Sequence, residues 1–278
     1  MTDRHGDRAE RLPRGIWSST AIGVSAAAIG WFVTAAVPAV TSSYTRLDQL
    51  TALILGALTG AGVLGARAYR QRRSTGFGIT AGALLGGVGA LAGASVIVFD
   101  HAAITPRWFV VERVMAWLLT AVGTALFLGM HVERKRWRWL RESLLIAAIG
   151  GGTAGAMFSL PGASDAWQAI AFAWFGGAIA FAVSGPELWH AFAVIEGAPA
   201  KGRGWNPLLM REWPLHDAAS LDLGEAQVAC QGGRVALYPP AGGLVSNGHS
   251  VREPRLLESN ALIVIGRARY HIQLLRAP

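Results

Sequence analysis

The chain has 278 residues, of which 52% are hydrophobic and only 15% are charged. A soluble domain usually carries about 25% charged residues, so this composition excludes an ordinary soluble enzyme. The formal net charge is +8, and the single cysteine, Cys230, excludes a disulfide within the chain and a cysteine-rich metal site. Glycine is frequent inside long apolar runs, where it would weaken a soluble helix, and this favours a bilayer as the solvent.

Six long apolar runs follow a charged N-terminal tail over residues 1–16. A helix needs ~20 mostly apolar residues to cross the hydrocarbon core of a bilayer. The first run is longer than the core of a signal peptide, so we interpret it as a retained span. The expected fold class is therefore an all-α, six-helix transmembrane bundle over 17–195. The expected spans are 17–40, 49–67, 76–99, 108–131, 142–160 and 167–195.

Basic residues alternate between the connections of this expected bundle. Four arginines precede the first run, four lie in 67–73 and five Arg or Lys lie in 134–141. The connections 41–48 and 100–107 carry one each. The positive-inside bias then predicts a multi-pass protein of the bacterial cytoplasmic membrane with both termini in the cytoplasm. Membrane topology and contact with anionic lipids explain the positive charge, and we expect no nucleic-acid partner.

Glycines four residues apart recur within the expected helices. In a bilayer, small residues at this spacing let two helix backbones come close together. Two interpretations stay open: the glycines pack the bundle of one chain internally, or they form a surface for a second copy or another protein. The glycines concerned are Gly56, Gly60, Gly82, Gly86, Gly89, Gly93, Gly151 and Gly155.

Few ionisable residues lie deep within the expected spans. Glu112 and Arg113 lie about one turn inside the fourth span, and we expect an intramembrane ion pair there. A haem or pigment held by histidine needs two imidazoles on facing helices. His101, His131 and His190 show no such paired pattern, so we expect no metal and no cofactor.

The composition changes near residue 196, where apolar runs shorten and prolines cluster. Runs that alternate or are rich in β-branched residues predict strands, and Asn247-Gly248 is a strong hairpin turn. This pattern predicts a soluble all-β sandwich over 196–278. The expected strands are 205–211, 226–230, 234–238, 243–246, 261–266 and 268–275.

Several segments of this region resemble the strand order of a forkhead-associated domain. The likeness covers about 191–278, and six glycine-rich helices followed by such a domain also resemble a type of bacterial membrane protein of unassigned role. The resemblance implies a forkhead-associated-like sandwich on the cytoplasmic side. The segments that carry it are Val194–Arg203, Ala226–Tyr238, Leu244–Gly248 and Leu256–Gly266, followed by Arg269-Tyr270.

Forkhead-associated domains hold phosphothreonine with a Gly-Arg pair, a Ser-Arg-x-His stretch and a distal asparagine. The resemblance places Met210-Arg211 at the first motif, 222–225 at the second and Pro240–Gly243 at the third. The second reads Asp-Leu-Gly-Glu, so carboxylates stand where the family keeps phosphate donors, and we expect no phosphate-dependent binding. The residues expected at a partner-binding site are Arg211, Asp222, Glu225, Gly242, Gly243 and Asn247.

The sequence favours a protein that is not an enzyme, because the tail has no G-x-S-x-G turn or ordered Ser-His-Asp arrangement. We expect a membrane anchor or scaffold subunit, surrounded by membrane lipids, that recruits other proteins or forms a homo-oligomer. The alternative is a transporter or channel whose soluble domain regulates gating. A water-lined central cavity would favour the alternative, and a dry bundle packed by Gly and Ala would favour the scaffold.

Overall fold

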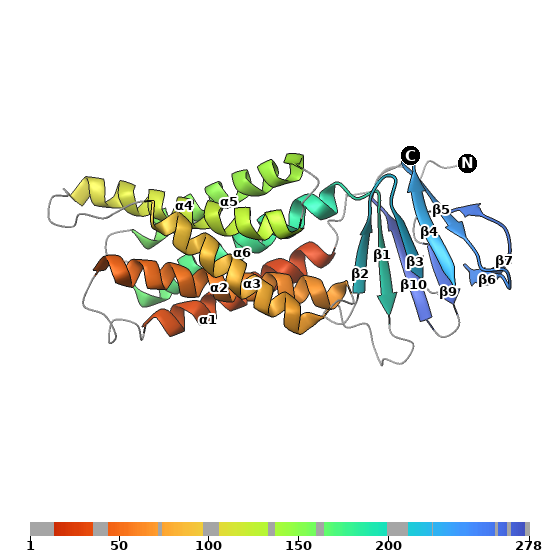
Figure 1. The fold of residues 1–278 in the computed structure, drawn as a ribbon, viewed down its shortest axis with the longest axis horizontal. Helices are drawn as coiled ribbons and strands as arrows, with labels where there is room; N and C mark the ends of the chain where they lie inside the picture. The colour runs from red at the N-terminus through yellow and green to blue at the C-terminus, as the bar shows by residue number, and fades with distance from the viewer. Residues whose placement is uncertain are drawn as a thin grey trace, which may run out of the picture. The chain divides into compact units, whose positions relative to one another are not determined.

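The chain consists of two compact units (Figure 1). The helical unit covers Ile16–Pro186, and the β unit contains Glu187–Pro278. The computed structural model describes residues 14–35, 44–71, 74–96, 106–132, 137–159, 164–198, 211–223, 225–258, 261–265 and 268–275.

Six α-helices make up the helical unit, and the last of them continues into the β unit. Side-chain caps begin two of them, because Ser74 accepts a hydrogen bond from the Phe77 N–H (3.3 Å) and Ser164 accepts one from the Trp167 N–H (3.3 Å). Pro106 opens another helix, where its missing N–H costs nothing. The helices are α1 Arg14–Ala35, α2 Tyr44–Arg70, α3 Thr75–Ala94, α4 Pro106–Val132, α5 Trp137–Phe158 and α6 Asp165–Trp189.

Among the described residues, five of the helices are long and apolar enough to cross a membrane. The exception is α5, for which the sequence predicted a span over 142–160. Arg138, Arg141 and Glu142 lie in its first two turns and lower its mean hydropathy. Length and composition alone therefore support five of the six expected spans.

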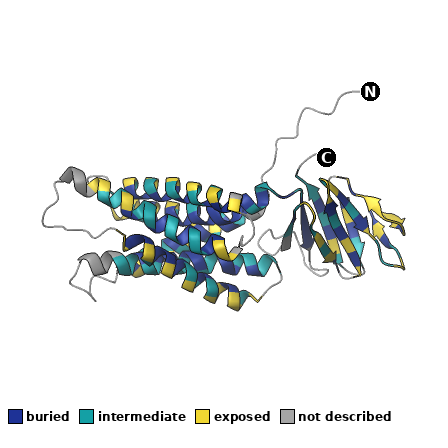
Figure 2. Cartoon of the chain, turned by 45° about the horizontal axis from the view of Figure 1, so that its top comes forward, coloured by how far each residue is buried: buried dark blue, intermediate teal, exposed yellow. Residues whose placement is uncertain are grey.

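Exposed residues, drawn in yellow, recur along the helices of the helical unit (Figure 2), and many of them are large and apolar. Phe32 is 69% exposed and Phe77 is 67% exposed, and Leu145 on α5 is 63% exposed. Such a surface would be strongly unfavourable in water, whereas in hydrocarbon it meets lipid chains. The helical unit is that of a multi-pass membrane protein, and α5 shares its apolar outer surface.

Each helix contacts the next one in the chain, and α1 also contacts α6. Gly62 of α2 lies near Ile22 of α1, and Gly23 of α1 lies against Gly176 of α6. The interior is apolar, with an aromatic cluster of Trp117, Phe158, Phe172 and Phe175 in which ring centres are 5.2–5.9 Å apart. Alanine, leucine and valine from α1, α2, α4, α5 and α6 complete this core.

The backbones of α2 and α3 touch at four glycines. A methyl group added to Gly60 would overlap the carbonyl oxygen of Gly82, and one added to Gly82 would overlap that of Gly60. Gly56 and Gly86 face each other in the same way. No side chain fits between the two helices here, so the four glycines set the separation of α2 and α3.

Glycines of α3 make the same kind of contact with α4. A methyl group on Gly89 would overlap the carbonyl oxygen of Gly123, and one on Gly93 would overlap that of Leu119. Gly123 faces Gly89 in return. The backbone of α3 is therefore in close contact on two sides, with α2 and with α4.

The remaining expected glycines lie between α5 and α4. A methyl group on Gly151 would be 2.7 Å from the Trp117 carbonyl oxygen, and one on Gly155 would be 2.8 Å from the Trp117 Cβ. All eight glycines thus face another helix of the same chain. This arrangement favours internal packing over a surface for a second copy.

The described residues of the β unit form ten strands. They form two antiparallel sheets, one of six strands in the order β2-β1-β10-β9-β6-β7 and one of four in the order β3-β4-β5-β8. The strands are β1 Ala193–Ala198, β2 Arg211–Leu215, β3 Ser220–Leu223, β4 Ala226–Gln231, β5 Arg234–Tyr238, β6 Leu244–Ser246, β7 His249–Val251, β8 Arg255–Leu256, β9 Ala261–Ile265 and β10 Ala268–Leu274.

The two sheets share one hydrophobic core. Ile195, Ile263 and Ile272 of the larger sheet belong to the same buried cluster as Val228 and Leu237 of the smaller one. Burial alternates along the strands, as expected when one face of a sheet meets a core and the other does not. The sheets therefore pack face to face.

Five expected strands are found within a residue or two of their expected bounds, and Asn247-Gly248 forms the turn between β6 and β7. Both turn residues have positive φ (49° and 81°), as a two-residue hairpin requires. The expected strand at 205–211 lies outside the described residues except for Arg211, where β2 begins.

The boundary between helix and sheet differs from the expected one. The sequence predicted a span to residue 195, but α6 ends at Trp189 and β1 begins at Ala193. Val194 and Ile195 are both buried, so the first half of β1 is apolar on both faces, and in the sequence it continues the hydrophobic pattern of the preceding helix. The β unit therefore begins before residue 196.

We predict that Gly86→Leu destabilises the helical unit, because the new side chain would overlap the Gly56 carbonyl and push α2 and α3 apart. Overpacking of this kind costs ~1–3 kcal/mol. Thermal unfolding of the detergent-solubilised chain should show a lower Tm. Gly76→Leu is the matched control, because position 76 of the same helix has no atom within 4 Å of an added methyl group. Equal Tm values for the two variants would contradict the close contact.

Candidate partner-binding site

Strand pairing brings most of the expected site residues to one end of the β unit. Arg211 at the start of β2 pairs with Gly197, and the pairing continues through β10 and β9 to β6, where Val245 pairs with Val264. Residues 239–243 precede β6 and follow β5. We call this the turn end, defined by Arg211, Asp222, Glu225, Pro240–Gly243 and Arg252.

The β3–β4 turn belongs to the turn end because Gln227, near the start of β4, pairs with Tyr238 at the end of β5. Asp222 is exposed, and its Oδ1 accepts a hydrogen bond from the Gln227 side chain (3.1 Å). Glu225 is exposed in the turn itself. Two carboxylates therefore face solvent at this end.

Leu223, which the expected resemblance aligns with an arginine of the forkhead-associated family, is only 4% exposed. Its side chain belongs to the core that the two sheets share. The position is therefore turned away from any ligand at the turn end.

The segment Pro240–Gly243 is a tight turn closed by a hydrogen bond from the Gly243 N–H to the Pro240 carbonyl (2.8 Å). Gly243 has a φ of 75°, and a methyl group there would lie 3.0 Å from Cγ of Arg252. Gly242 has open space around it. The stem of Arg252 thus lies along this turn.

Exposed arginines also gather near the turn end, which the sequence analysis did not anticipate. Arg252 follows β7, Arg255 begins β8 opposite Leu237, and Arg269 lies near the start of β10. The sequence could have indicated these three arginines, because each lies next to the end of a strand. The side chain of Arg211 lies outside the described residues. The turn end therefore carries both signs of charge.

Asn247 does not lie with the other expected site residues. Its side-chain oxygen accepts a hydrogen bond from the Leu262 N–H (2.7 Å), and its own N–H donates to the Leu262 carbonyl (2.8 Å). The β6–β7 turn that contains it lies at the opposite end of the strands from Leu244. The role of Asn247 is to fix this turn.

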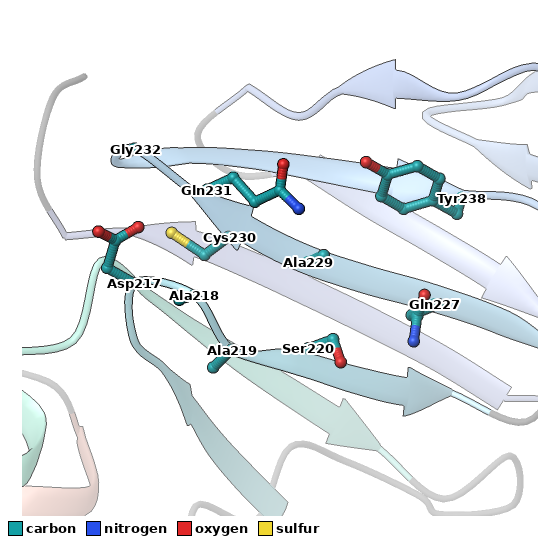
Figure 3. Close-up of a pocket in the computed structure, with 10 residues that line it drawn as sticks. All are labelled: Asp217, Ala218, Ala219, Ser220, Gln227, Ala229, Cys230, Gln231, Gly232 and Tyr238. Carbon is teal, nitrogen blue, oxygen red and sulfur yellow. The ribbon is translucent and has the colours of Figure 1, made fainter.

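A depression of about 510 Å³ lies on the smaller sheet, outside the expected site (Figure 3). Ser220, Gln227, Gln231 and Tyr238 border it, and Ala229 is a small residue between them. The β3 and β4 positions that border the depression are thus small or uncharged. This surface offers hydrogen-bonding groups and apolar area in similar measure.

Cys230 borders the same depression but is fully buried. Burial raises the pKa of its thiol, and the nearby Asp217 carboxylate raises it further. Asp217 also accepts a hydrogen bond from the Gly233 N–H (3.4 Å). The thiol is therefore neutral near pH 7 and is a poor nucleophile.

In the helical unit, the structure does not bring Glu112 and Arg113 together. The Arg113 guanidinium lies 5.0 Å from the centre of the Phe158 ring, a cation–π contact. The buried Oε2 of Glu112 has no hydrogen-bond partner within the described part of the chain. Consecutive residues of a helix point in different directions, which explains the separation.

The chain matches no protein-family model, no curated protein and no solved structure. Its function is therefore argued from the residues and geometry above.

Proposed function

We propose that the chain is a non-catalytic scaffold of the bacterial cytoplasmic membrane that recruits another protein through the turn end of a forkhead-associated-like domain. The observation that carries this proposal is the gathering of separate loops at one end of the β unit. Those loops present exposed Asp222, Glu225 and Arg252 side chains. A surface of loops with mixed charge on a rigid sandwich suits recognition of a partner with complementary charges.

The two-sheet architecture supports the likeness to a forkhead-associated domain, because two antiparallel sheets on one core are the fold that the resemblance implies. The details of the turn end support a binding mode without phosphate. Asp222 and Glu225 would repel a dianion, and Leu223 is buried in the core.

The packing of the helical unit supports six membrane crossings. A hydrogen bond from the Trp174 indole of α6 to Thr153 of α5 (2.7 Å) and the contact of Gly151 with α4 hold α5 along two helices that are apolar enough to span. A helix of 22 residues is about 33 Å long, close to the hydrocarbon thickness. With α5 counted, both termini would lie on the same side, and the basic residues of the connections favour the cytoplasm for that side.

The interior supports a scaffold over a transporter or channel. Backbone contacts at glycines and a core of alanine, valine and phenylalanine fill the space between the helices. A conducting pathway would need a continuous polar lining.

We predict that both termini are cytoplasmic. Single cysteines are introduced by Thr2→Cys and by Asp165→Cys in a Cys230→Ala variant. Their labelling shows on which side of the membrane each position lies. A membrane-impermeant maleimide should label position 165 in intact cells and position 2 only after the cells are opened. Labelling of position 2 from outside would overturn this topology.

We predict that a phosphothreonine peptide binds no better than its unphosphorylated twin. Each missing charge-assisted hydrogen bond removes ~1.5–3 kcal/mol, and the two carboxylates add repulsion. Calorimetry with a degenerate phosphothreonine library measures the difference directly. A phosphate-dependent affinity in the micromolar range would show that the domain reads phosphate.

We predict that Arg252→Glu reduces co-purification of the partner from native membranes in mild detergent, because it reverses a charge at the turn end. Arg234→Glu is the matched control, since Arg234 is an exposed arginine of β5 next to the turn at the opposite end. Quantitative mass spectrometry of the two purifications gives the readout. Equal loss in both variants, or no loss in either, would count against the turn end as the contact.

A further inference from the structure

In the described part of the chain, β3 is an edge strand of the smaller sheet. Antiparallel strands alternate between residues whose backbone groups bond to the partner strand and residues whose groups point away from it. The Cys230 N–H donates to the Ala219 carbonyl (2.9 Å), and the register of β3 and β4 makes Leu221 the next residue bonded in this way. The backbone N–H and C=O groups of Ser220 and Asp222 therefore point away from β4, toward the edge of the sheet.

The side chains of β3 differ between its two faces. Leu223 is buried in the core that the two sheets share, and Leu221 packs against this core while partly buried. Ser220 and Asp222 are exposed on the outward face. A strand added beside β3 would therefore meet an apolar side chain at Leu221 on one face and short polar side chains on the other.

The depression of about 510 Å³ borders this edge of the sheet (Figure 3). Ser220 lies directly opposite Ala229 of β4, and both side chains are small. Gln227 and Gln231 lie two residues before and after Ala229, so the three side chains share one face of β4. A long side chain that enters over Ser220 can therefore lie across Ala229, beside amide groups that both donate and accept hydrogen bonds.

Charge differs between the two ends of this face. Asp222 is exposed and accepts one hydrogen bond from the Gln227 side chain (3.1 Å), which leaves further acceptor capacity on its carboxylate. Arg234 of β5 is exposed and stands opposite Gln231, toward the other end of β4. Because opposite charges on neighbouring strands attract, a basic residue of a ligand is favoured beside Asp222 and disfavoured near Arg234.

We propose that β3 is a docking edge for an extended segment of a partner protein, which adds a strand to the smaller sheet and places one side chain in the depression. Backbone hydrogen bonds to Ser220 and Asp222 hold the segment, and its alternate side chains give specificity. The residue beside Asp222 is basic, the next one is apolar and covers Leu221, and the one beside Ser220 is long and polar. This surface lies beyond the proposed turn end, with which it shares only Asp222.

A second copy of β3 fits this edge less well than such a segment. If β3 paired with itself, it would place Ser220 or Asp222 beside the depression, and both side chains are too short to lie across Ala229. The strand reads Ser-Leu-Asp-Leu, so it offers no basic residue to Asp222. Exposed strand edges can pair with their own copies, and the experiment must therefore detect self-association.

Selection from a library of short peptides tests the docking edge. The peptides have β-branched apolar residues at alternate positions and any residue between them, and the full chain in a neutral detergent is the bait. We expect the selected peptides to carry Arg or Lys and a long polar residue at successive outward positions. Methylation of the backbone N–H groups on the bonding side should weaken binding about tenfold or more, because it removes the strand hydrogen bonds. No selection, selection without basic residues, or equal binding of the methylated peptide would overturn the proposal.

Two variants locate the effect on β3. Ser220→Trp fills the depression from an exposed position, so the Kd of a selected peptide should rise about tenfold or more at unchanged Tm. Asp222→Lys should change the preferred basic residue to an acidic one. Ser250→Trp is the matched control and should bind like the parent, since Ser250 is exposed on β7, an edge strand of the larger sheet. Equal binding by the parent and Ser220→Trp, or an unchanged preference in Asp222→Lys, would refute this edge.

Disulfide crosslinking tests the second copy as the occupant. Ser220→Cys in a Cys230→Ala variant places a single thiol on the edge strand. We expect the oxidised protein to run as a monomer. An efficient disulfide between two copies, lost on addition of a selected peptide, would show that β3 pairs with itself and would overturn the choice of partner.

Discussion

The close approach of helix backbones at facing glycines is the constraint on which the helical unit depends. In a bilayer, lipid tails are as apolar as leucine, so helices associate through packing contacts rather than through the hydrophobic effect. Pairs such as Gly60 and Gly82 provide that packing because nothing separates their backbones. The positions where two backbones touch are therefore reserved for small residues. Bulky side chains lie elsewhere, either in the aromatic cluster of the interior, as Phe175 does, or on the lipid-facing surface, as Phe77 does.

The β unit is stabilised by the burial of apolar side chains rather than by contact between helix backbones. Its two sheets bury isoleucine, valine and leucine in a shared core, and strands such as β4 and β5 alternate between that core and the outside. Antiparallel pairing then decides which loops become neighbours. Glu225 and Arg252 are 27 positions apart in the sequence, yet both belong to the same end of the strands. A surface with mixed charge arises from the topology and not from a local motif.

Sequence periodicity and composition predicted the six helices and five of the strands because those signals are local. The prediction failed where one sequence pattern is compatible with two kinds of secondary structure. The run at Ala193–Ile195 is apolar on both faces, which a buried strand and a membrane helix share. The strand β2 contains Pro214, which weakens any strand signal but is tolerated at the sheet edge that β2 occupies.

The site residues were predictable only in part, for a related reason. Asp222, Glu225 and Gly243 come together because each lies near a strand end on the same side, whereas Asn247 is one strand further along and so lies at the other end. The buried Cys230 has a practical consequence of its own. As the single thiol of the chain, it is a natural reporter whose chemical reactivity follows the opening of the sandwich. The helical unit contains no cysteine, so thiol exchange in intact membranes would follow the unfolding of the sandwich independently of the bundle.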